Sequence, residues 1–366
     1  MVNEQYQKSK QQLAFSRKQV EKAGRIFRKK EGDVEFATEV IQNYRAAHLY
    51  PLTIIKNLVW KHVKKLHLLE SATIVRRLKR LPTIIDKLQR ETLDGKSENA
   101  ISLKRMHDIG GCRVILDSLD HLYELNNSLD SSRTVHSVKS YDYIKHPKAT
   151  GYRGIHRVYK SYNNLESHDY KGFQIEVQLR TRLQHLWATT VEIIDIIEKE
   201  TLKTNPKMAD TDWKRLFFIM GEFLAVKDGA HQLTQQQILV YTDELATLNK
   251  KLAAFHKLDA FNRAFQLDEI KNKSKNTGFA LLVHNTETQE GRAFLYAPNK
   301  KQQALTHYAE HEKQQALTHY AEHEKQTQNN VLLVAGSDLK SIEKAYPNYL
   351  NDTSEFLSEF SRILLT

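Results

Sequence analysis

The sequence predicts an α+β protein whose main domain is a mixed β-sheet flanked by helices, followed by a small β-β-α-β-α domain. Helical periodicity dominates before residue 100 and returns from 181 to about 201, and short β-branched or alternating runs lie between these stretches. Strand patterns then reappear after a polar break at 272–278. We therefore expect a domain at 1–200, a helical connector at 201–272 and a small domain at 273–366.

The first part of the chain reads as three helical stretches. Apolar residues recur near helical spacing from Glu4 to about Lys30, and again from about 34 to 69, where Pro51 is a possible break. A third helix is expected from about Thr83, because this residue follows Pro82 and can act as an N-cap.

Strand patterns fill the middle of the first domain. The run 112–116 is β-branched and follows a glycine pair, which is typical of a buried strand. The runs 154–160 and 173–179 alternate apolar and polar residues and therefore predict half-buried strands. The chain after Thr181 regains helical periodicity.

The second half predicts a helical hairpin or bundle and then the small domain. The bundle is expected over 205–270 from an apolar stripe: Leu233, Ile238, Leu239, Leu245, Leu248 and Leu252. The small domain has strand patterns at 279–284, 292–296 and 331–334 and a C-terminal helical tail. Residues 301–312 recur unchanged at 313–324, which is a tandem duplication and not a solenoid, since a solenoid needs at least three repeats.

Composition limits the classes of protein. The net charge of +11 favours a polyanionic partner, although a merely basic enzyme has the same balance. A single cysteine, Cys112, excludes an intrachain disulfide and a cysteine-rich zinc site. The N-terminal residues lack the apolar core of a signal peptide, and no apolar run approaches the ~20 residues of a membrane helix. We expect a cytoplasmic protein that does not enter a membrane.

A basic cluster is the first candidate site. Arg77, Lys79, Thr83 and Lys87 place three cations and a hydroxyl in an expected loop and the helix after it. Arginine and lysine in such a cluster suit polyphosphate binding, and a helix N-terminus adds its dipole. The alternative is an ordinary solvated basic face.

Acidic residues at two strands suit a metal. Asp108 stands before Gly110, Gly111 and the strand at 112–116, where it can reach a Mg²⁺ that bridges phosphates, and Arg113 can return to the same pocket. The alternative for Asp108 is a turn aspartate. Glu176 alternates with Gln178 and Arg180, so the three side chains are expected on one face of the strand.

The loop from Tyr143 to His156 is suited to a nucleotide. It combines aromatic residues, several cations and glycines, and therefore offers stacking for a base and charge for phosphates.

In their order, these motifs resemble the RelA/SpoT pyrophosphotransferase family over roughly residues 40–200. The motifs are R-x-K-x3-T-x3-K from Arg77, D-I-G-G-x-R from Asp108, G-Y-R-x-I-H from Gly151 and E-V-Q-L-R-T from Glu176. The resemblance implies transfer of the β,γ-diphosphate of ATP to a ribose 3′-hydroxyl.

The resemblance also implies residue roles. Arg77 and Arg113 would sandwich adenine, and Lys79 and Lys87 would hold the ATP phosphates. Asp108 and Glu176 would bind Mg²⁺, with Glu176 also accepting the proton of the attacking hydroxyl, and Tyr152 would stack on the acceptor base. The full expected sets are Arg77, Lys79, Thr83, Lys87 and Arg113 for ATP, and Lys145, Tyr152, Arg153, His156, Gln178 and Arg180 for the acceptor.

Two acceptors are consistent with the resemblance. Alarmone synthetases use GDP or GTP, whereas a toxic branch modifies the 3′-CCA end of tRNA. Ile193 stands where alarmone synthetases typically carry histidine, and the chain is similar to the fused toxin–antitoxin members called CapRel. Seven basic residues between Arg17 and Lys30 suit a tRNA backbone, although they also suit a plain solvated helix. We expect tRNA as the acceptor, with GDP or GTP as the alternative, and no DNA partner.

The C-terminal domain resembles the CapRel antitoxin module, a pseudo zinc-finger without zinc ligands. Tyr346 and Tyr349 match its Y-x-x-Y element, which implies blocking of the adenine site until a phage structural protein, typically a capsid protein, binds. Two packing tyrosines are the alternative. The paired histidines 307/311 and 319/323 could bind a metal, but a solvated helix is expected. A catalytically idle nucleotide-binding module remains a different class of explanation.

Overall fold

The computed structural model describes residues 10–79, 81–90, 101–197, 211–264, 279–285, 291–296, 329–335 and 353–365. The duplicated segment 301–324, its histidine pairs, Tyr346 and Tyr349 lie outside these residues. No helix in the described ranges is long and apolar enough to cross a membrane.

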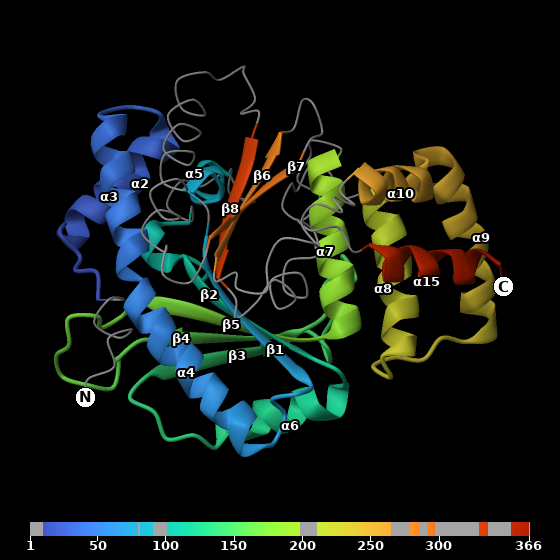
Figure 1. Ribbon diagram of the computed structural model, residues 1–366, viewed down its shortest axis with the longest axis horizontal. Coiled ribbons are helices and arrows are strands. Elements are labelled where there is room, and N and C mark those ends of the chain that lie inside the picture. The colour runs from blue at the N-terminus through green and yellow to red at the C-terminus, as the bar shows by residue number, and fades with distance from the viewer. Residues whose placement is uncertain are drawn as a thin grey trace.

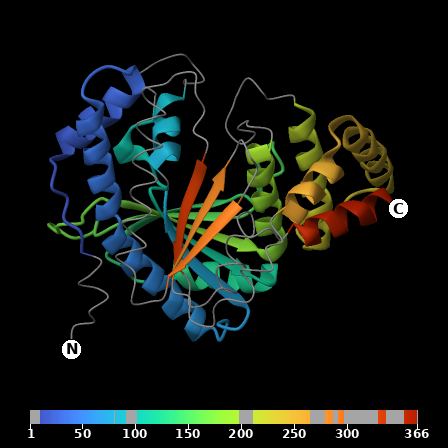
Figure 2. The same cartoon turned by 45° about the horizontal axis from the view of Figure 1, so that its top comes forward.

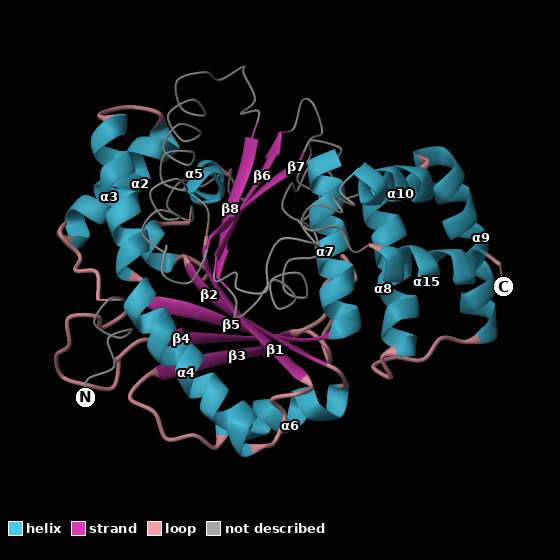
Figure 3. Ribbon diagram, viewed as in Figure 1, coloured by secondary structure: helices cyan, strands magenta, loops and turns pink. Residues whose placement is uncertain are grey.

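A five-stranded mixed sheet is the frame of the first domain. Its strands are β1 (Ala72–Leu78), β2 (Gly110–Leu116), β3 (Ser137–Asp142), β4 (Ile155–Lys160) and β5 (Gln174–Thr181), in the order β1-β2-β5-β4-β3. Strands β2 and β5 are parallel, and the other neighbours are antiparallel. This mixed sheet confirms the predicted α+β class (Figure 3).

Helices flank this sheet (Figure 1). They are α2 (Arg17–Lys29), α3 (Val34–Ala47), α4 (Leu49–Lys65), α5 (Leu81–Gln89), the short 3₁₀ helix η2 (Leu103–Arg105), α6 (Leu119–Asp130) and α7 (Arg182–Ile197). Side chains of α4 and α6 share one apolar core with β2, β4 and β5. A second core joins α2, α3 and α5, so the N-terminal helices are packed onto the domain and not appended to it.

Three local predictions were wrong. Arg77, the first residue of the basic cluster, lies in strand β1 and not in a loop, because Thr73, Ile74 and Val75 form a β-branched run that pairs with β2. The expected break at Pro51 lies instead at His48, since proline is tolerated in the first turn of α4. Thr83 lies inside α5 and is not its N-cap.

A helical module follows the first domain. It consists of α8 (Asp212–Lys227), α9 (Gln235–Leu252), α10 (Ala254–Ala264) and the C-terminal α15 (Ser354–Leu364). Phe356 and Phe360 of α15 are fully buried in the core that α7, α8, α9 and α10 share. The expected apolar stripe is only partly correct: Leu245 and Leu248 are buried, but Ile238 and Leu239 are exposed.

The strands predicted near 279, 292 and 331 are present as β6 (Phe279–Asn285), β7 (Gly291–Tyr296) and β8 (Asn329–Ala335). They form an antiparallel sheet in the order β7-β6-β8. Strand β8 lies against β1, and both views place the small sheet between α5 and α7 (Figure 2). The division of the chain at residues 200 and 272 stays a prediction, while α15 packs with the helical module.

Candidate active site

Asp108 lies between two lysines. Lys79 follows β1 and Asp108 precedes β2, and the pairing of these strands brings the two residues together, with Lys79 N–H donating to the Ile109 carbonyl at 2.8 Å. Lys79 Nζ lies 2.9 Å from Asp108 Oδ2, and Lys87 Nζ from α5 lies 3.0 Å from Oδ1. Burial alone would raise the pKa of Asp108, but the two ammonium groups outweigh it and hold that pKa well below its usual range.

Glu176 is the centre of a second polar cluster, on β5. Its Oε1 lies 2.9 Å from His156 Nδ1 of β4, and its Oε2 accepts a hydrogen bond of 2.7 Å from Gln178 Nε2. Burial opposes ionisation of Glu176, yet the hydrogen bonds from His156 and Gln178 and the charge of His156 lower its pKa to about 2. Glu176 is therefore a carboxylate at neutral pH.

The polar cluster continues along β5 to Tyr152. Arg180 Nη2 donates to Gln178 Oε1 at 2.9 Å and to the Tyr152 hydroxyl at 3.1 Å, and that hydroxyl also contacts His156 Nε2. Glu176, Gln178 and Arg180 thus lie on one face, as the two-residue alternation predicts. The Tyr152 ring is only 8% exposed and packs edge-on to Trp187 of α7.

An aromatic pair lies next to Tyr152: Tyr141 was not among the predicted site residues, and Tyr143 was named only as the start of the nucleotide loop. Tyr141 and Tyr143 are stacked, with ring planes 6° apart, and Tyr143 is edge-on to His156. The ammonium of Lys148 lies 4.4 Å from the Tyr143 ring centre and 5.0 Å from that of Tyr152. The two-residue alternation from 141 to 143 was the available signal for this surface.

Lys145, which was expected at the acceptor, lies over the ring of Tyr123 of α6, at 5.3 Å from its centre. Arg113 is buried and lies opposite Gln178 in the pairing of β2 with β5. Thr83 is half-buried in α5. Arg77 pairs with Gly111 through the backbone, and its side chain is outside the described part of the chain.

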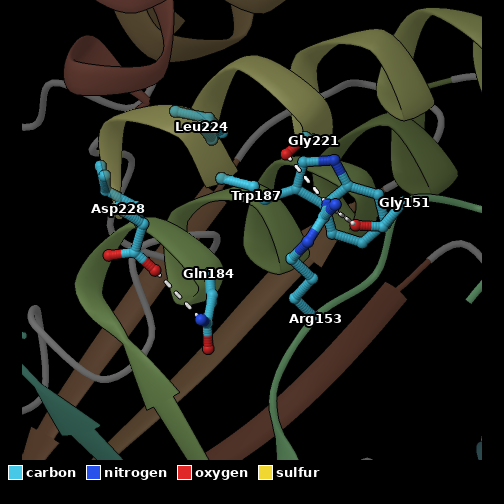
Figure 4. A pocket seen from close by; sticks show the side chains of 9 residues that line it. Gly151, Arg153, Gln184, Trp187, Gly221, Leu224 and Asp228 are labelled. Carbon is cyan, nitrogen blue, oxygen red and sulfur yellow. Dashed lines mark hydrogen bonds between the residues drawn. The ribbon is translucent and has the colours of Figure 1, made fainter. Parts of the chain in front are cut away.

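Arg153 is directed toward the helical module and not toward Glu176. It is 6% exposed, and its guanidinium donates to the carbonyl oxygens of Gly221 and Gly151 and to Glu222 of α8. Figure 4 shows this side chain beside Trp187, at a small pocket that also contains Gln184 and Asp228. Its predicted contact with the acceptor stays a prediction.

The carboxylates fit a phosphate-bridging divalent cation. Such a cation is usually held by one or two carboxylates together with substrate phosphates. Asp108 and Glu176 are both ionised, and they are close enough for the charge of Asp108 to act on the pKa of Glu176. Among the described residues, no group of three or more acidic, histidine or cysteine side chains forms a separate metal cluster. Two carboxylates are the donor set that suits a metal arriving with the phosphates of a nucleotide.

Residues 76–195 match the family model described as a region found in RelA / SpoT proteins. The GTP pyrophosphokinase YwaC of Bacillus subtilis is 30% identical over 113 residues, which are 31% of this chain and 52% of YwaC. The GTP pyrophosphokinase YjbM of the same organism is 29% identical over 113 residues, 31% of this chain and 51% of YjbM. The chain thus spans about half the length of these relatives.

Solved structures give a weaker likeness. Small alarmone synthetase 2 from Bacillus subtilis has a TM-score of 0.38 and 20% identity, covering 51% of this chain and 94% of that one. Small alarmone synthetase 1 from the same organism, bound to pppGpp, has a TM-score of 0.33 and 22% identity, covering 43% and 74%.

Proposed function

We propose that the RelA/SpoT region at residues 76–195 transfers the β,γ-diphosphate of ATP to the 3′-hydroxyl of a nucleotide and releases AMP. The observation that carries this proposal is the pair of ionised carboxylates: Asp108 lies between Lys79 and Lys87, and Glu176 on β5 is held by His156 and Gln178. Transfer of a phosphoryl group depends chiefly on positioning and charge neutralisation, which this arrangement supplies.

Each side chain has a role in this proposal. Lys79 and Lys87 leave Asp108 to bind the β- and γ-phosphates, because a phosphate offers them more negative charge than one carboxylate. Asp108 and Glu176 would hold a divalent cation, for which Mg²⁺ is our choice, and the cation supplies neutralisation of the phosphates. Arg113 and Arg77 are proposed at adenine, and Thr83 near the phosphates.

Glu176 also orients the attacking hydroxyl. A carboxylate with a pKa of about 2 is a weak base, so Glu176 is proposed to take the proton of the hydroxyl only as the hydroxyl oxygen bonds to phosphorus. Gln178 and His156 fix the carboxylate by occupying one oxygen each. Tyr152 and Arg180 are proposed to form the wall on which the acceptor base rests.

GDP or GTP is the acceptor that we propose first, because the relatives that match this segment are GTP pyrophosphokinases. A tRNA 3′ end is the second candidate. It is supported by α2, where Arg17, Lys18, Lys22, Arg25 and Lys29 are all exposed. It is also supported by Ile193, which is buried in the apolar core at the position where alarmone synthetases typically carry a histidine.

The test offers the full-length chain [γ-³²P]ATP together with GDP, GTP or bulk tRNA. Label on GDP or GTP supports alarmone synthesis, and label on tRNA alone supports the toxin. Asp108→Asn is the control, and it should abolish transfer to either acceptor. If neither wild type nor Tyr349→Ala, which lacks the ring proposed below to inhibit the site, labels any of these acceptors or releases AMP, the proposed function is wrong.

We also propose that residues 273–366 inhibit the site until a phage structural protein binds them. The position of β8 against β1, the strand that leads to Lys79, supports this proposal.

The variant Tyr349→Ala tests the inhibition, because it removes the aromatic ring. It should make the chain toxic to growing cells without a trigger, whereas Tyr349→Phe keeps the ring and should not. Equal growth of both strains would contradict the inhibition, and co-expression of a phage capsid protein tests the trigger.

A further inference from the structure

The loop that carries Tyr152 is in direct backbone contact with α8. A Cβ on Gly221 of α8 would lie 3.0 Å from the Gly151 oxygen and 3.1 Å from Trp187 Nε1. A Cβ on Gly151 would lie 3.1 Å from the Cα of Phe218. Two glycines therefore allow a contact that side chains would prevent, and Gly151 also has a φ of +86°, which favours glycine.

A buried ion pair holds the same contact. Arg153 Nη2 lies 2.7 Å from Glu222 Oε1, and Nη1 donates to the Gly221 oxygen at 3.1 Å and to the Gly151 oxygen at 3.3 Å. Both side chains of the pair are nearly inaccessible. The other oxygen of Glu222 lies 3.1 Å from His231 Nε2, so the carboxylate is held from two sides. A guanidinium buried to this extent is tolerated only with such a partner.

The position of Arg153 in the chain connects this pair to the candidate site. Arg153 follows Tyr152, whose hydroxyl contacts both His156 and Arg180, and His156 contacts Glu176. A change in the direction of the Arg153 side chain would move the backbone of its neighbour. The geometry of the acceptor side thus depends on a residue of the helical module.

We infer that Glu222 is a positioning residue for the acceptor side of the site, acting through Arg153 on Tyr152 and His156. Glu222 does not touch the reacting atoms in this scheme. It holds the turn at 151–154 against α8, and α8 thereby becomes a part of the acceptor site although it lies outside the RelA/SpoT region. The expected effect of Glu222 on the KM for the acceptor rests on the proposed function. Its expected effect on the turn at 151–154 does not.

The test compares Glu222→Gln with Glu244→Gln in the full-length chain. Glu244 makes an ion pair with Arg215 at 2.6 Å that joins α9 to α8, so its substitution also removes an ion pair of α8. Amide hydrogen exchange of residues 148–154 should rise about tenfold or more in Glu222→Gln and remain as in wild type in Glu244→Gln. Exchange in β2 should be unchanged in both, which separates a local effect from loss of the fold.

The kinetic arm measures the acceptor and ATP separately. In Glu222→Gln, the KM for the acceptor that wild type uses should rise about tenfold, while the KM for ATP stays within about twofold. Arg153→Gln combined with Glu222→Gln leaves no unpaired charge at this contact, so the chain should stay folded, yet it should retain the raised acceptor KM. An acceptor KM restored to the wild-type value in this double variant would reduce the pair to a purely structural role.

The two arms separate the two proposals. Exchange at 148–154 that is the same in Glu222→Gln and wild type, or raised equally in Glu244→Gln, overturns the positioning inference whatever the activity. A rise confined to Glu222→Gln, in a protein that transfers no label even when Tyr349→Ala is added, upholds the positioning of the loop and rejects the proposed reaction.

Discussion

The buried side chain of His48 predicts how the free energy of unfolding depends on pH. It lies between α3 and α4 with no exposed surface; its Nδ1 is 2.8 Å from the Tyr44 oxygen, and its ring packs on Tyr44 and Phe173. Its Nε2 has no partner among the described residues. A proton on Nε2 would bury a charge without an acceptor, and this burial, only partly offset by the bond to Tyr44, lowers the pKa of His48 to about 4.

The pH dependence has a definite sign. With an ordinary pKa of 6.5 in the unfolded chain, His48 takes up a proton on unfolding below that pH, which favours the unfolded state. The contribution to stability is complete above pH 6.5 and is lost as the pH falls from 6.5 to 4. At about 1.4 kcal/mol for each pH unit, the loss over this range is about 3 kcal/mol.

Urea unfolding at pH 7, 6, 5 and 4.5 measures this contribution. The variant His48→Leu removes the titrating group and retains an apolar side chain, so its stability should depend less on pH than that of wild type. At pH 7 the variant should be about 1 kcal/mol less stable, since it loses one hydrogen bond. If both proteins lose the same free energy of unfolding over this range, His48 is not buried in the neutral form.

Three further predictions concern the site and the helical module. Glu176→Gln should lower turnover about 10²–10³-fold, as loss of one electrostatic contact typically does, measured by release of AMP. Gly221→Ala should destabilise the chain by about 1–3 kcal/mol in urea unfolding, because its methyl group meets the backbone of Gly151; an unchanged midpoint would contradict that contact. Phe360→Ala should cost about 3–5 kcal/mol in the same assay, whereas Leu365→Ala, at an exposed position, should cost little.

The sequence predicted the site best where polar side chains follow the two-residue period of a strand. Alternation along β5 correctly placed Glu176, Gln178 and Arg180 on one face, since a strand fixes the direction of each side chain locally. Strand β1 was missed because the basic residues at its end, Arg77 and Lys79, were interpreted as part of a loop. Its β-branched residues were the better guide to local structure.

Long-range packing limited the rest of the prediction. The acceptor role of Arg153 stays a prediction, but its ion pair with Glu222 was not foreseen, because Glu222 is distant in the chain and belongs to a helix without a recognisable motif. The burial of Tyr152 depends in the same way on Trp187 of a following helix. Single-sequence patterns carry no information about such pairings, whereas a folded chain determines them.

The packing of α10 against α15 has a consequence for any change in the segment between them. Helix α10 ends at Ala264 and α15 begins at Ser354, and the rings of Phe255 and Phe360 meet at 6.1 Å. The two ends of the segment 265–353 are therefore held at one place in the helical module. If this segment inhibits the site as proposed, a trigger cannot carry it far into solution, and its effective concentration at the site stays high. On that proposal, a trigger must remain bound to keep the site open, and re-closure should be fast once the trigger dissociates.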